Sequence, residues 1–180
     1  LAAAAGGLAL ALSGAGATAD NDINLVTQSL VTNANIQAGH INVTANSSVD
    51  SEAKVVAVAA AISGGLNAGS GAVGVSLADS HIGTDTLAEF ATPVTSALVM
   101  GSKLTASGNI LLSAKAIENQ TVQVAAAAVA IALGKGGAVA ETGLDVVIGN
   151  FSTVQAIAEN SSLYAKGNIT VKSESQTTIG

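Results

Sequence analysis

The chain has 180 residues, of which 49% are hydrophobic but only 2% are aromatic. This composition argues against disorder and against an enzyme domain with a deep, aromatic-lined pocket. Six lysines, no arginine and twelve acids give a net charge of −6, which excludes a basic surface for nucleic acid. The chain has no cysteine, which excludes disulfides and thiolate metal ligands and is compatible with a secreted protein.

The first segment, Leu1 to Leu12, is the longest apolar run of the sequence. It is shorter than the ~20 residues that a membrane-spanning helix needs, so we expect no membrane insertion. Similar Ala/Val/Gly runs return at 55–62 and 124–133, where no signal peptide can lie. We therefore expect the first segment to belong to the fold, and the chain to be a piece of a longer protein.

A marker sequence around a glycine occurs three times. The marker glycines are Gly39, Gly108 and Gly167, so the spacing between them is first 69 and then 59 (108 − 39 and 167 − 108). We interpret the difference as a ten-residue insertion around Phe90 to Val99, which contains the only proline, Pro93. The pattern predicts one segment with about three imperfect repeats, 1–54, 55–121 and 122–180.

The residues after each marker glycine alternate between apolar and polar with a period of two, which predicts strands. The apolar positions are Ile41, Val43 and Ala45, then Ile110, Leu112 and Ala114, then Ile169 and Val171. Clusters of Gly, Asn, Asp and Ser recur between such runs, so we expect the strands to be short.

The Ala-rich run from Val124 to Leu133 is ambiguous, because alanine has the highest helix propensity. We favour a strand, because the run lacks helix caps and has apolar residues on both faces. Its small side chains would let another sheet or chain approach its outer face.

Repeated strands of this kind are typical of a solenoid, in which each strand pairs with its equivalent in the next coil. If a coil took ~20 residues, the chain would make about nine coils. We therefore predict an all-β fold, a parallel β-helix that forms part of a longer rod.

The marker strands 38–45, 108–110 and 167–171, with the Ala/Val/Gly blocks 71–76 and 136–140, resemble the repeat region of filamentous haemagglutinin-type adhesins of Gram-negative bacteria, especially the leukotoxin-like filamentous adhesins. The resemblance covers nearly the whole chain. It implies a right-handed β-helix, export through an outer-membrane partner, a location on the bacterial cell surface and a role in cell adhesion. The implied partner is a host or neighbouring cell surface, and lateral or end-to-end self-association is compatible with it.

The two histidines, His40 and His81, occupy inequivalent repeat positions, so we expect them in surface turns rather than in a zinc site. The carboxylates that could offer oxygens to Ca²⁺ at coil corners are Asp20, Asp22, Asp79 and Asp85. They lack the spacing of a calcium-binding β-roll, so we expect them to be solvated turn residues. We assign no catalytic, cofactor-binding or metal-binding residue.

Asparagines of the Asn-x-Ser/Thr pattern are candidate glycan acceptors at Asn42, Asn46, Asn119, Asn150, Asn160 and Asn168. The marker asparagines, Asn109 and Asn168, are expected to hydrogen-bond backbone at turns.

Some parallel β-helices act on polysaccharides, and such chemistry needs two carboxylates facing one groove. Here the acids show no recurrence on one face of the predicted strands and the aromatic residues are scattered, so we expect no enzyme. The leading hypothesis is a structural and adhesive rod segment. A self-assembling extracellular filament or surface-layer subunit is the alternative, and a carbohydrate-active β-helix is a third reading.

Overall fold

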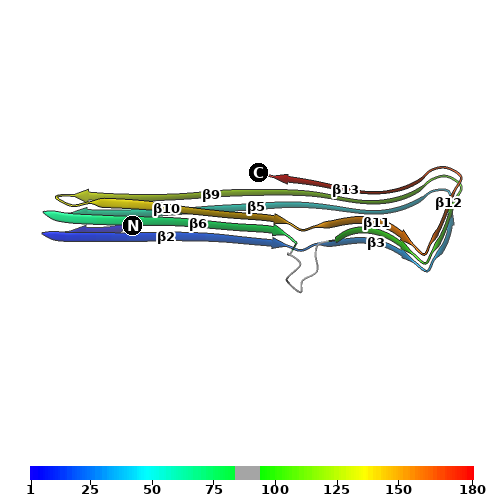
Figure 1. Ribbon diagram of the computed structural model, residues 1–180, viewed down its shortest axis with the longest axis horizontal. Helices are drawn as coiled ribbons and strands as arrows, with labels where there is room; N and C mark the ends of the chain where they lie inside the picture. Colours follow the sequence, from blue (N-terminus) through cyan, green and yellow to red (C-terminus); the bar gives the residue numbers. More distant parts are fainter. Residues whose placement is uncertain (84–93) are drawn as a thin grey trace. The chain divides into compact units, whose positions relative to one another are not determined.

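The computed structural model describes residues 1–83 and 94–180, which form strands and turns without a helix (Figure 1). After β1 (Ala2–Ala5), the first repeat consists of β2 (Leu8–Ile23), β3 (Val26–Thr32), β4 (Asn35–Ala38) and β5 (Ile41–Gly64). The second consists of β6 (Asn67–Ile82), β7 (Val94–Met100), β8 (Lys103–Ala106) and β9 (Ile110–Leu133). The third consists of β10 (Ala138–Asn150), β11 (Thr153–Glu159), β12 (Ser162–Ala165) and β13 (Ile169–Ile179).

Strands at equivalent positions of successive repeats lie next to one another. The four sheets have the orders β1-β5-β9-β13, β2-β6-β10, β3-β7-β11 and β4-β8-β12. The pairs of β7 with β3 and β11, of β8 with β4 and β12, and of β13 with β9 are parallel. The prediction of an all-β fold with parallel pairing between repeats is therefore confirmed. In the described residues no helix is long and apolar enough to cross a membrane.

The register shows how far apart equivalent positions lie in the sequence. Ala2 pairs with Ala61 and Val94 pairs with Thr153, so the repeat step is 59 in both cases (61 − 2 and 153 − 94). The short coil expected from the sequence is therefore wrong. A repeat is longer because it runs through four strands, two of which are long, before it returns to the same sheet.

The difference of ten between the two marker spacings has two sources. Val26 pairs with Val94, a step of 68 (94 − 26), which exceeds the usual step of 59 by nine. The remaining residue reflects a shorter turn in the first repeat: 39–40 join β4 to β5, whereas 107–109 join β8 to β9 and 166–168 join β12 to β13. The predicted insertion was placed too late, because 94–99 belongs to β7. Phe90 and Pro93 lie outside the described residues.

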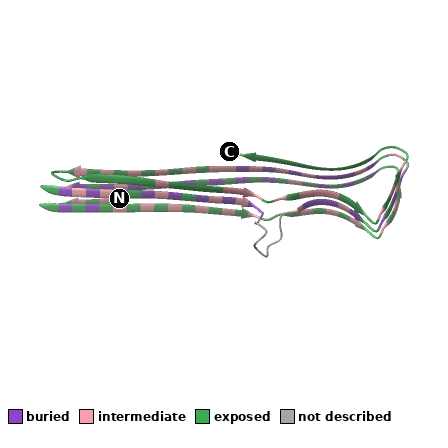
Figure 2. Ribbon diagram, viewed as in Figure 1, coloured by how far each residue is buried: buried purple, intermediate pink, exposed green. Residues whose placement is uncertain are grey.

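Several strands are much longer than expected. β5 and β9 have 24 residues each, and β2 and β6 have 16 each. Polar residues do not end these strands. Successive side chains continue to point to opposite faces of the sheet, so each residue, polar or apolar, has a place on one face. The Ala-rich run 124–133 lies in β9, as predicted, and buried and exposed residues alternate along β5 and β6 (Figure 2).

The described chain divides into two compact units. The first, unit 1, comprises 1–21, 52–80 and 121–148. Its core is made of alanine: Ala11, Ala59, Ala61 and Ala72 are buried together. The Ala/Gly residues therefore allow the close approach of two sheets on the inner face, and the approach of another sheet or chain to the outer face stays a prediction. The Ser76 hydroxyl of β6 donates a hydrogen bond of 2.7 Å to the carbonyl oxygen of Ala125 in β9.

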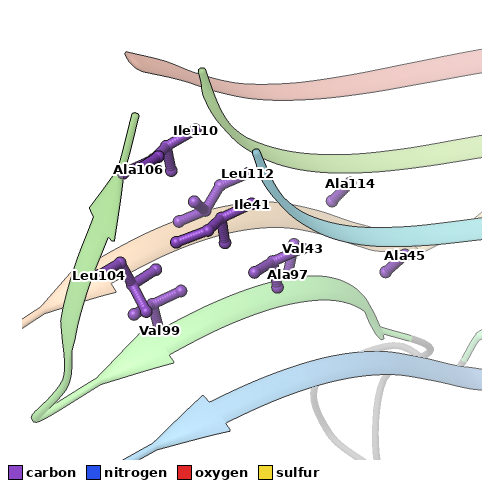
Figure 3. Packing of buried hydrophobic residues seen from close by; sticks show 10 residues of the cluster. All are labelled: Ile41, Val43, Ala45, Ala97, Val99, Leu104, Ala106, Ile110, Leu112 and Ala114. Atoms are coloured by element: carbon purple, nitrogen blue, oxygen red, sulfur yellow. The ribbon is translucent and has the colours of Figure 1, made fainter. Parts of the chain in front are cut away.

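The second unit, unit 2, comprises the described parts of 22–51, 81–120 and 149–180. Its core has larger side chains, including Ile41, Leu104, Ile110 and Leu112, which converge in Figure 3. The alternating positions predicted in the first two marker strands are all buried. Their equivalents Ile169 and Val171, in the last strand of the sheet, are about half exposed.

Candidate functional site

The turn between the second and third strands of each repeat has a left-handed backbone at one position. Asn33, Gly101 and Asn160 have φ values of 49°, 57° and 50°. Asparagine and glycine tolerate this conformation better than other residues do. The N–H of Asn33 donates to the carbonyl of Met100 at 2.9 Å, and the N–H of Gly101 donates to that of Glu159 at 3.0 Å. The turns thus hold one repeat to the next.

Serine follows the left-handed residue in the last two repeats. The Ser102 hydroxyl accepts the N–H of Ala34 at 3.0 Å, and the Ser161 hydroxyl accepts the N–H of Ser102, also at 3.0 Å. Each hydroxyl also donates to a carbonyl two residues earlier in its own turn, at 2.8 Å. These side chains therefore satisfy turn groups of two adjacent repeats.

The marker turn carries a second set of side-chain bonds between repeats. Nδ1 of His40 accepts the N–H of Asn109 at 3.1 Å, and Oδ1 of Asn109 accepts the N–H of Asn168 at 2.9 Å. The prediction of backbone bonding is confirmed for Asn109. His40 is an exposed turn residue, as expected, but it serves as the first member of this ladder. The shared marker position was the signal that could have identified this role.

His81 differs from the expectation, because it lies within β6 rather than in a turn. Its Nδ1 is 3.4 Å from a carboxylate oxygen of Asp22, and its ring centroid is 6.1 Å from that of Phe151. The side chain is 25% exposed. Asp22 and His81 are separated by exactly one repeat step (81 − 22), so they occupy equivalent positions on neighbouring strands. Sequence reasoning missed this pair because the register was unknown.

A buried carboxylate in unit 2 is the centre of a polar cluster. Glu118 is 3% exposed, and its Oε2 accepts hydrogen bonds from Asn150 Nδ2 at 2.6 Å and from the Ser152 hydroxyl at 2.8 Å. The Thr177 hydroxyl lies at 3.5 Å. These bonds join β9 to the end of β10, to the turn that follows it and to β13. The cluster occupies interior space and fastens the last repeat to the second one.

Three carboxylates gather on the outer face of the β2-β6-β10 sheet in unit 1. Asp20, Asp79 and Asp145 line a shallow hollow of about 320 Å³ with Leu77 and Val147. The expectation that acids do not recur on one face is therefore wrong. Asp20 and Asp79 are separated by one repeat step (79 − 20), which equals the second marker spacing, but the sequence did not show that strands one such step apart lie side by side.

The acids that we expected to be solvated residues at coil corners lie elsewhere. Asp20 and Asp22 belong to β2, and Asp79 belongs to β6, so these three are strand residues rather than corner residues. Asp85 lies outside the described residues. Within 1–83 and 94–180, no group of three His, Cys, Asp or Glu residues is arranged to hold a metal ion.

Two of the candidate glycan acceptors make hydrogen bonds with acidic side chains. Asn119 donates to a carboxylate oxygen of Asp50 at 2.6 Å, and Asn150 donates to the buried Glu118. A glycan on Asn150 would require this bond to break, so Asn150 is a poor acceptor in the folded chain. No protein-family model, curated protein or solved structure matches the chain.

Proposed function

We propose that the chain is a structural and adhesive segment of a large secreted bacterial surface protein of the filamentous haemagglutinin type. It is a right-handed parallel β-helix that acts on the outside of the cell, with a host or neighbouring cell surface as its partner. Its repeats space or present a binding surface, and no residue acts catalytically.

The observation that carries this proposal is the repeated use of turn residues, through backbone and side-chain hydrogen bonds, to join repeats. The Asn33 and His40 positions, with their equivalents, bond across successive repeats at both ends of the short β4, β8 and β12 strands. The parallel registers add a backbone hydrogen-bond ladder along each sheet. This arrangement favours mechanical resistance, because pulling one repeat away requires many bonds to break together.

Single-molecule force spectroscopy tests the mechanical part of the proposal. With a repeat step of 59, as between Asn109 and Asn168, we expect the chain to lengthen by multiples of about 200 Å, since an extended residue spans ~3.5 Å. A smooth extension without discrete steps would contradict the proposal.

Beads coated with the folded chain should also be retained on bacterial or epithelial cells, and beads coated with the heat-unfolded chain are the control. Equal retention of both would remove the adhesive part.

The acids of the hollow favour a second candidate, a carbohydrate-active β-helix. Asp20 and Asp145 are exposed, so two carboxylates can face a substrate. Incubation with a panel of bacterial and host polysaccharides, followed by a reducing-end assay, tests this function. Release of sugar that Asp20→Asn and Asp145→Asn both abolish would support it, and no release from any polymer would refute it.

A further inference from the structure

The distribution of large and small side chains in unit 1 is the reverse of that in an ordinary sandwich. Alanines fill the space between the sheets, while leucines lie outside. On β2, Leu8, Leu10 and Leu12 are 85%, 66% and 68% exposed. Exposed apolar surface of this extent marks an interaction site.

This outer face has a ridge and an adjacent groove. Leu10 lies over Gly69 of β6, with its Cδ1 3.4 Å from the position of a Cβ there, and Leu12 lies over Gly71 at 3.1 Å. Leu8 and Leu10 border an apolar hollow of about 360 Å³ that has Gly69 and 136–137 in its lining. Farther along β2 the ridge ends at Gly14, where an added Cβ would meet open space.

We propose that this face, formed by the outward residues of β2, β6 and β10 in unit 1, binds the same face of a second copy with the strands antiparallel. This inference does not depend on the proposed function. A two-fold axis that crosses β2 between Leu12 and Gly14 places Leu12 opposite Gly14 of the second copy. It also places Leu10 opposite Gly16 of the second copy.

The same axis also places the residues of the neighbouring strand. Because Leu12 lies over Gly71, the axis crosses β6 between Gly71 and Val73. Gly71 then faces Val73 of the second copy. On β2, leucines therefore meet glycines of the second copy, which lets the two sheets pack closely there; on β6, Val73 meets the Leu12 side chain that covers Gly71.

Charge at the two ends of the face favours the antiparallel orientation, whereas beside the axis Glu141 of β10 lies opposite Val139 of the second copy. Lys135 lines the apolar hollow at one end of the face, and the acids Asp20, Asp79 and Asp145 surround the hollow at the other end. The carbonyl of Val139 on β10 is 4.0 Å from the Cβ position of Gly71, so the axis crosses β10 near residue 140. Lys135 and Asp145 are equally far from that point along the chain (140 − 135 and 145 − 140). Lys135 thus approaches Asp145 of the second copy, whereas parallel strands would bring the two acidic ends together.

The size of the face sets the expected affinity. The face spans 8–18 of β2 and the neighbouring stretches of β6 and β10, where Glu141 and Asp145 are charged; at ~3.3 Å per residue and ~4.8 Å per strand it covers about 500 Å² in plan for each copy. A total of about 1000 Å² for both copies is at the lower end for specific complexes. We therefore expect a dimer that dissociates at concentrations on the order of micromolar.

Sedimentation velocity over a concentration series of the 180-residue chain tests the proposal. Leu10→Lys should raise the dissociation constant at least about tenfold, while circular dichroism verifies the fold. The matched control is Val58→Lys on β5, in the β1-β5-β9-β13 sheet, since Val58 is also largely exposed, at 61%. Lys135→Glu should weaken the dimer, and adding Asp145→Lys should restore it.

Cross-linking provides a measurement that does not depend on stability. The chain lacks cysteine, so Val73→Cys, next to the axis, should give a dimer with a short bismaleimide, and Val58→Cys should not. A monomer at all concentrations, or oligomers that respond to Val58→Lys as strongly as to Leu10→Lys, would overturn the proposal. The proposal would also be overturned if the chain did not self-associate but bound phosphatidylcholine vesicles, and if Leu10→Lys abolished this binding. The face would then be assigned to lipid.

Discussion

The close approach of the two sheets in unit 1 predicts that an added methyl group at Gly74 will destabilise the protein. A Cβ at this position would lie 2.8 Å from the carbonyl oxygen of Ala127 and 3.3 Å from its carbonyl carbon. Both atoms belong to the backbone of β9, so the clash is relieved only if one sheet moves by about half an ångström. Gly74→Ala therefore tests the spacing between the sheets directly.

The magnitude follows from two opposing terms. Overpacking of a close-packed interior costs about 1–3 kcal/mol. Alanine also restricts the unfolded chain more than glycine does, which offsets about 0.4–1 kcal/mol. We expect a net loss of about 1–2 kcal/mol, and a melting temperature lower by about 2–8 °C for a chain of this size.

Thermal unfolding followed by circular dichroism measures this change. Gly64→Ala is the control, because Gly64 is also a strand residue and a Cβ there has no atom within 4 Å. The control should melt at or slightly above the temperature of the parent chain. If Gly74→Ala also melts at or above that temperature, the sheets are not in contact at β9 and the account of the alanine core is wrong.

Three further changes test unit 2 by thermal or urea unfolding. Ile110→Asp should abolish the folding of its repeat, because Ile110 is fully buried and a charge there has no partner; an unchanged melting curve would place Ile110 outside the core. Asn109→Ala should cost about 0.5–1.5 kcal/mol through loss of its bond to the next repeat, and Asn168→Ala should cost less, since its side chain lies in the last described repeat; equal losses would contradict the ladder. Glu118→Leu should cost about 1–3 kcal/mol, because Asn150 loses its acceptor, and an unchanged stability would exclude a structural role for the carboxylate.

The strand prediction succeeded where it depended on local alternation. Ile110 and Leu112 are buried on one face because successive strand residues point to opposite sides, and no distant information is needed for that. The Ala-rich run 124–133 was also predicted correctly as strand, because its lack of caps and polar stripe is visible locally.

The site residues were predicted less well, because their environments depend on pairing across a whole repeat. The marker turns were visible as a sequence pattern, so the backbone bond of Asn109 could be expected. His81 and Asp22 gave no such local signal, since their proximity follows only from the register. The buried Glu118 was not singled out at all, because its partners Asn150 and Ser152 are far from it in the sequence.

The sequence by itself determined the all-β class and the repeated marker strands, because both follow from the alternation of apolar and polar residues with a period of two. Only the tertiary structure decided that one coil takes a whole marker spacing, that the strands are long and that Gly74 contacts Ala127 closely. Local alternation tells which residues share a face of a strand, but it does not tell which strand lies beside that one or which sheet lies opposite. Those choices depend on the combined packing and hydrogen bonding of residues far apart in the chain.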